Sequence, residues 1–175
     1  KRRRFATEMG ERLHVDVAAV DSAEEAVRAA DIVVVATNTT GHAVTLAFHG
    51  AWMEPGVHVN AIGSTMPSLR EIDEETFARA TVIVTDAPAE QLERESGDVA
   101  AALAAGTYDR HRLAQLKEVL VGRADGRRSD GDVTLYKSVG EALQDVAAGY
   151  AVYKVAEARG IGTDVGDFLE PKAFG

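Results

Sequence analysis

Three short runs of apolar, largely β-branched residues constrain the fold most strongly. They occupy residues 31–36, 57–62 and 81–85, and polar residues follow each of them. The first run, DIVVVA, has almost no polar alternation, which is typical of a strand covered on both faces. Helical patterns separate the runs, so the sequence predicts an α/β fold built from βαβ units with a parallel sheet.

Caps and periodicity set the expected helices. Ser22 followed by Glu25 forms a capping-box pattern, and Asp73 is expected to cap a short helix over 74–80. The charged, glycine-containing segment 123–132 is expected to be a surface loop. Further helices are expected over 2–12, 88–95, 98–105, 110–121 and 140–158, with strands near 14–17 and 133–137.

Composition excludes several classes of function. The 175 residues carry a formal net charge of −9, which argues against a nucleic-acid groove or an anionic membrane surface. No apolar run approaches the roughly 20 residues of a membrane span. The chain has no cysteine, and its five histidines show no ligand spacing, so no metal site is expected. The basic opening, KRRR, is interpreted as the solvated face of a helix.

Polar clusters follow the strands, at residues 37–39, 60–65 and 85–86. In open α/β sheets, ligands bind beyond the carboxyl ends of the strands. The clusters therefore fit a dinucleotide-binding half-fold with Asn38 among its contacts, although ordinary loops also need such turn and cap residues. Gly63 is open to two interpretations, a close approach to a flat ring or a plain turn glycine.

Charged residues near these clusters also have two interpretations. Lys137 is either a proton donor or phosphate contact, or the partner of Glu141 and Asp145 on the following helix. The acidic runs at 70–75 and 93–98 suggest a metal or paired-carboxylate site, or else helix starts. We interpret them as helix starts, where carboxylates favour the positive end of the helix dipole.

Five segments in order carry a resemblance to a known family. They read FATEM, EEAVRAADIVVVATNT, GAWMEPGVHVNAIGSTMP, REID and YKSVGEALQD. Together they resemble the ornithine cyclodeaminase/mu-crystallin family of NAD(P)-dependent oxidoreductases. The resemblance implies a Rossmann-like doubly wound parallel sheet with flanking helices. That fold is expected to be truncated at its amino-terminal side, because the chain opens inside a helix without a glycine-rich fingerprint.

The resemblance also implies two domains and a partner. Residues 1–135 are expected to form a partial NAD(P)-binding domain. Residues 136–175 are expected to form a strand and a helix that return toward a substrate and dimerisation domain before Lys1. That earlier segment would hold the glycine fingerprint, the residue that selects NAD or NADP, and the arginine and lysine that bind the substrate carboxylate. Relatives in the family are homodimers, and the cytoplasm is the expected location.

Individual roles follow from the same resemblance. Thr37 is expected to contact the cofactor, Ser138 to reach the nicotinamide, and Val139 to lie beside the substrate. No catalytic residue is assigned. The nicotinamide ribose region is expected to be lined by Val59, Asn60, Ala61 and Ile62.

The activity implied is hydride transfer between NAD or NADP and an amino acid or its cyclic imine, by cyclodeamination or ketimine reduction. Cyclodeaminases of the family carry an aspartate acid/base where this chain has Thr65. A threonine hydroxyl cannot shuttle protons as a carboxylate does at neutral pH, so the segment 64–67 favours the mu-crystallin and ketimine reductase branch. The alternatives are a non-catalytic mu-crystallin-like protein that binds a cofactor or small ligand, and an inactive fragment.

Overall fold

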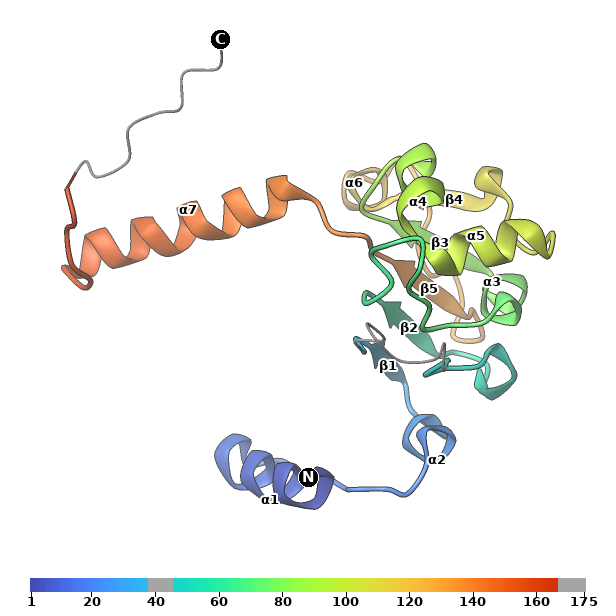
Figure 1. Cartoon of the computed structure of the whole chain (residues 1–175), viewed down its shortest axis with the longest axis horizontal. Coiled ribbons are helices and arrows are strands. Elements are labelled where there is room, and N and C mark those ends of the chain that lie inside the picture. Colours follow the sequence, from blue (N-terminus) through green and yellow to red (C-terminus); the bar gives the residue numbers. More distant parts are fainter. Residues whose placement is uncertain (38–45, 167–175) are drawn as a thin grey trace, which may run out of the picture. The chain divides into compact units, whose positions relative to one another are not determined.

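The computed structural model describes residues 1–37 and 46–166, in which an all-parallel sheet forms the centre of the first of two units (Figure 1). The units comprise residues 1–140 and 141–175. The strand order is β1-β2-β5-β3-β4, which confirms the expected parallel α/β fold. The strands are β1 Ile32–Val35, β2 His58–Ala61, β3 Val82–Thr85, β4 Leu113–Gln115 and β5 Thr134–Lys137.

Most helices begin and end near the expected residues. At the first expected cap, Ser22 Oγ accepts the Glu25 N–H at 3.1 Å, while the Glu25 carboxylate accepts the Asp21 N–H at 3.0 Å. The capping box therefore closes on Asp21 instead of Ser22. The helices are α1 Arg2–Leu13, α2 Ala23–Val27, α3 Glu74–Arg79, α4 Ala89–Glu95, α5 Gly97–Ala104, α6 Leu116–Leu120 and α7 Ala142–Arg159, with 3₁₀ turns η1 Gly50–Trp52 and η2 Arg110–Arg112.

The prediction of one helix over 110–121 is wrong for the middle of that segment. There the chain forms η2, then strand β4, then the short helix α6. Leu113 has helical spacing to Leu116 and Leu120, but its segment pairs in parallel with β3, with Leu113 opposite Ile83. Sheet hydrogen bonding therefore overrides the local helical pattern.

The short strand expected near 14–17 is also wrong. His14 ends α1 in the left-handed region with φ 55°, and the residues after it are irregular. Within the described chain this segment pairs with no strand, so its backbone forms no hydrogen bonds of a β-sheet.

One face of the sheet carries the hydrophobic core. Strand register places Val33, Val59, Leu135 and Ile83 in one row across the sheet, and each is at most 6% exposed. Helices α3, α4 and α5 bring their apolar side chains to the same cluster. Those helices contribute Phe77, Leu92, Val99 and Ala102.

Strand β1 is covered on one face only in the described residues. Val33 and Val35 are buried, whereas Ile32 and Val34 are 64% and 62% exposed. The expectation that this run is covered on both faces is therefore wrong for the described chain. The helices that line the core lie on one side of β1, and no described element covers the other side.

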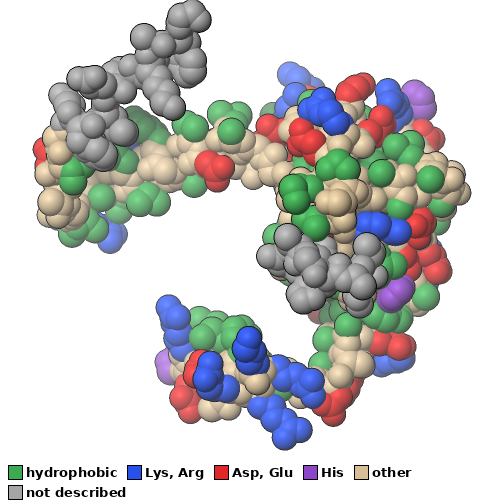
Figure 2. Space-filling model, viewed as in Figure 1, with side chains coloured by type: hydrophobic (Ala, Val, Ile, Leu, Met, Phe, Trp, Pro, Cys, Tyr) green, Lys and Arg blue, Asp and Glu red, His purple; other side chains and the backbone are tan. Residues whose placement is uncertain are grey.

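Helix α7 is the helix of the second unit and carries many exposed apolar side chains (Figure 2). The stripe expected from its periodicity, which includes Leu143, Val146, Tyr150 and Tyr153, lies on this helix and is exposed. Over the described ranges, no helix combines the length and apolar character that a membrane span requires.

Candidate functional site

The carboxyl ends of four neighbouring strands lie along one edge of the sheet. Parallel register places Val35, Ala61, Lys137 and Thr85 in one row, the last row of β1, β2, β5 and β3. The residues that follow this row share the edge, which is where open α/β sheets bind ligands. The structure therefore brings together the strand-end clusters that the sequence singled out.

The predicted residues of β2 divide between the core and the edge. Val59 and Ala61 are fully buried, so their side chains belong to the core. Asn60 lies between them on the opposite face and is half-buried, and Ile62 at the edge is 40% exposed. Asn38 lies outside the described residues.

The side chain of Glu71 joins the ends of β1 and β2. Its Oε1 accepts the Thr37 hydroxyl at 2.5 Å and also the Thr37 N–H. Its Oε2 accepts the Gly63 N–H at 2.6 Å. Glu71 is fully buried, and sequence analysis assigned it only to an acidic helix start.

Gly63 is required by this carboxylate. A Cβ atom at position 63 would collide with both oxygens of Glu71, and the φ of Gly63 is outside the left-handed region. This contact gives a physical reason for glycine that a plain turn does not supply. Close approach is the right physical reason, but the group approached is the protein's own carboxylate; approach to a flat ring stays a prediction.

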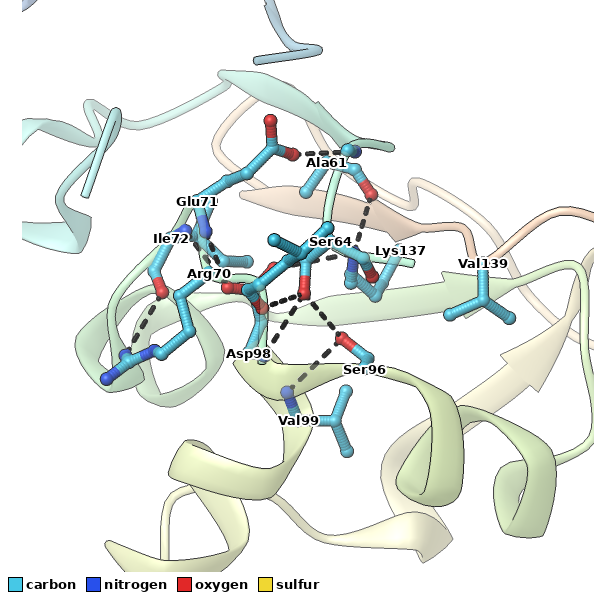
Figure 3. A network of polar contacts seen from close by, with 12 residues as sticks. Ala61, Ser64, Arg70, Glu71, Ile72, Ser96, Asp98, Val99, Lys137 and Val139 are labelled. Atoms are coloured by element: carbon cyan, nitrogen blue, oxygen red, sulfur yellow. Dashed lines mark hydrogen bonds and ion pairs between the residues drawn. The ribbon is translucent and has the colours of Figure 1, made fainter. Parts of the chain in front are cut away.

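Lys137 is a buried structural cation. Its Nζ donates to the carbonyl oxygens of Ala61, Ser64 and Ser138 at 3.2–3.3 Å and lies 3.4 Å from Asp98 Oδ2 (Figure 3). Burial lowers the pKa of Lys137, and attraction by Asp98 only partly offsets that effect. Three carbonyls and one carboxylate thus surround an ammonium that has three donors, and the side chain is fully buried.

The expected pairing of Lys137 with a carboxylate is thus right in kind, but the partner differs. The expected partners were Glu141 and Asp145, whereas the ion pair is with Asp98. Asp98 lies in the first turn of α5, and its Oδ1 also accepts the backbone N–H groups of Glu71 and Ile72 at 2.8 and 3.2 Å. One fully buried aspartate therefore connects the Lys137 ammonium to the segment that carries Glu71.

The helix-start interpretation of the acidic runs holds for Asp73 and Asp98 and fails for Glu71. It also fails for Glu93 and Glu95, which lie in the last turns of α4. Asp73 caps α3, and Asp98 lies in the first turn of α5. Glu71 precedes the cap by two residues and stands beside the buried Ile72, which is the signal in the sequence that it lies outside the helix. Within residues 1–37 and 46–166, no cluster of three acidic or histidine side chains could hold a metal ion.

Asp86 holds the residues that follow β5. Its Oδ2 accepts the Ser138 hydroxyl at 2.5 Å, and its Oδ1 accepts the Val139 N–H at 3.3 Å. The Ser138 oxygen in turn accepts the Gly140 N–H at 3.1 Å. The two residues expected nearest to nicotinamide and substrate are therefore fixed by one carboxylate at the end of β3.

The edge of the sheet combines apolar and hydroxyl-bearing residues. Ile62 has an exposed apolar side chain, and Thr37 is an exposed residue that carries a hydroxyl group. The carboxylates of the edge each accept N–H or O–H donors from the protein, so they are engaged within it. Such sites combine apolar surface with a few placed polar groups.

Comparison with known proteins tests the resemblance to a family. The chain is 37% identical over 142 residues to a delta(1)-pyrroline-2-carboxylate reductase of Bacillus cereus, a match that covers 81% of this chain and 42% of the reductase. The structure of the Thermococcus litoralis delta(1)-pyrroline-2-carboxylate reductase in complex with NADH and L-proline matches with a TM-score of 0.83 and 34% identity. That match covers 93% of this chain and 49% of the reductase chain.

A second solved structure is an archaeal alanine dehydrogenase dimer with bound NAD. It matches with a TM-score of 0.77 and 32% identity over 95% of this chain and 49% of that chain. The chain thus spans about half the length of the relatives it matches. The sequence model of one family matches residues 1–160. The chain belongs to the ornithine cyclodeaminase/mu-crystallin family.

Proposed function

We propose that this chain supplies most of the NAD(P)-binding domain of an oxidoreductase that reduces a cyclic imine of an amino acid. The observation that carries the proposal is the match, over 93% of the chain, to a reductase in complex with NADH and L-proline. The edge formed by β1, β2, β5 and β3 supports it, because its apolar and hydroxyl groups suit a nicotinamide and its ribose.

A bound NADH or NADPH would supply the hydride for the imine carbon, and a proton would be needed at the imine nitrogen. The residues of this chain would bind the cofactor and orient it toward the substrate. Thr37, Asn38 and the segment 59–63 would hold the nicotinamide ribose, and Ser138 would contact the nicotinamide. Val139 would lie beside the substrate, on the loop that Asp86 fixes.

Reduction is proposed ahead of cyclodeamination because of Thr65. This residue is exposed in the loop after β2, and its N–H donates to the Gly63 carbonyl at 3.1 Å. A threonine hydroxyl does not exchange protons at neutral pH as a carboxylic acid does. The proton for the imine nitrogen therefore comes from a group other than residue 65.

The test is a pair of measurements on the complete protein that its gene encodes. Fluorescence titration with NADH and with NADPH comes first, and we expect saturable binding of at least one. Oxidation of NADH or NADPH is then followed with a cyclic imino acid. Release of ammonia is measured separately with L-ornithine and oxidised cofactor, because cyclodeamination returns the hydride and consumes no nucleotide. We expect turnover in the first assay and little in the second.

Each result separates the proposal from its alternatives. A complete protein that binds neither nucleotide contradicts the proposal. Binding without turnover of any cyclic imine or amino acid identifies a non-catalytic cofactor-binding protein, which Thr65 would also allow. Turnover of L-ornithine at a rate comparable to imine reduction would show that Thr65 does not prevent cyclodeamination.

A further inference from the structure

Glu71 is anchored so that its side chain is aimed at the sheet edge. Its backbone N–H donates to Asp98, and its backbone carbonyl accepts the N–H groups of Ala47 and Phe48 at 2.8 and 3.0 Å. Hydrogen bonds to its backbone N–H and carbonyl groups therefore hold Glu71 in place independently of its side chain. The carboxylate then accepts donors from Thr37 and Gly63, which end two different strands.

Folding alone does not require a carboxylate at this position. Helix α3 is capped by Asp73, and neighbouring Ile72 supplies the apolar contact with the core. A fully buried charge is a weak source of stability, since an apolar residue of similar volume is often as stable or more so. The charge at Glu71 instead fixes the shape of the edge.

The turn after β2 is held from two sides. Glu71 takes the Gly63 N–H, and Lys137 takes the carbonyl oxygens of Ala61 and Ser64 (Figure 3). The same carboxylate takes the Thr37 N–H at the end of β1. The relative positions of Thr37 and the segment 61–64 are therefore set by one side chain.

We propose that Glu71 is a positioning residue for the cofactor: it holds the ends of β1 and β2 in the arrangement that the nicotinamide half requires. This inference rests on the proposed function. Glu71 itself does not face the ligand; it acts through Thr37 and Gly63.

The test compares Glu71→Gln with Asp73→Asn in the complete protein. The two carboxylates resemble each other, because each accepts two backbone N–H groups and one threonine hydroxyl. They differ in that both oxygens of Glu71 accept backbone N–H groups, whereas one oxygen of Asp73 accepts all three donors and the other lies 3.0 Å from His49 Nδ1. In E71Q the amide NH₂ must face either the Thr37 N–H or the Gly63 N–H. Two hydrogen-bond donors then face each other, and one hydrogen bond is lost. We expect E71Q to weaken NADH binding by about ten-fold or more and to alter the emission of bound NADH.

Asp73→Asn is the control for a purely structural loss. Asparagine keeps the oxygen that caps α3 away from the edge and loses only the charge, so we expect a slightly lower melting temperature with NADH affinity unchanged within about two-fold. All binding is measured well below both melting temperatures. Equal NADH affinity in E71Q and the parent overturns the inference and leaves the proposed function intact. A parent that binds no nucleotide overturns the proposed function, and the positioning role falls with it.

Amide hydrogen exchange decides the matter if E71Q does not fold. In the parent, the N–H groups of Thr37 and Gly63 are expected to exchange as slowly as those paired within β2. Exchange of these two groups at the rate of open loops would overturn the inference.

Discussion

Glycine is favoured at position 63 because the side chain of Glu71 occupies the space beside it. Gly63 leaves the space that the Glu71 carboxylate fills, and the two residues meet although neither is in a regular element. We expect Gly63→Ala to destabilise the protein by about 1–3 kcal/mol, because the added methyl group forces the carboxylate out of its position. The free energy of unfolding in urea measures this.

Shortening the acid supplies the control for that substitution. Glu71→Asp withdraws the carboxylate by one methylene group, so the Gly63→Ala, Glu71→Asp double variant is expected to lose less than the sum of the single variants. Additive losses would show that the methyl group at 63 collides with something other than the carboxylate.

The buried pair of Lys137 and Asp98 makes a second prediction at the scale of residues. Lys137→Met leaves a buried carboxylate without its cation and frees three carbonyl groups, so we expect a loss of about 3–5 kcal/mol. In a double-mutant cycle by urea unfolding, Asp98→Asn should cost less in the Lys137→Met background than in the parent. Independent effects of the two substitutions would contradict the pairing.

Helix α3 gives a prediction about pH at the scale of an element. Burial by itself raises the pKa of Asp73, but hydrogen bonds from Gly50, Thr76 and His49 outweigh it, so the pKa lies below its ordinary value. The unfolded chain therefore binds the proton more readily. The contribution of the cap is fully present above the unfolded pKa, about 3.9, and is lost as the pH falls through the folded pKa.

The measurement is the unfolding free energy of the parent and of Asp73→Asn between pH 3 and 7. Asparagine keeps the capping oxygen and loses only the charge, so we expect the difference to be about 0.3–1 kcal/mol at neutral pH and to shrink below roughly pH 4. A difference that stays constant over the whole range would show that the Asp73 charge does not stabilise the cap.

The elements differ in how far sequence could predict them, and for physical reasons. The strands β1 and β3 consist of β-branched residues, and β2 lies within the apolar run 57–62, so their pattern is local. Strand β4 is Leu-Ala-Gln, which has no strand preference of its own and pairs only because β3 lies beside it.

The same distinction separates the site residues. Thr37 and Ser138 follow strands, so the rule that ligands bind at strand ends places them from local pattern alone. Glu71 meets Thr37 across 34 residues of chain, and no local pattern reports that contact. The buried role of Asp98 likewise depends on the packing of α5 against the segment before α3.

At the scale of the whole molecule, the apolar surface of α7 calls for a packing partner. Leu143, Val146, Tyr150 and Tyr153 form one stripe, and all four are more than half exposed. An isolated helix of this length is marginal in water, and most helical stability comes from packing an apolar face. We predict that in the complete protein the stripe packs on the substrate and dimerisation domain expected from the family.

Tyr150→Gln tests this prediction, and Asp145→Gln is its control on the same helix. Five positions separate the two residues, which places them about 140° apart around the axis. If the stripe is buried in the complete protein, Tyr150→Gln lowers the unfolding free energy by about 1–3 kcal/mol, because the apolar area of a large ring returns to water. Asp145→Gln, away from the stripe, should change it by less than about 0.5 kcal/mol. Thermal unfolding of both variants measures the difference, and equal, small effects would place the stripe in solvent.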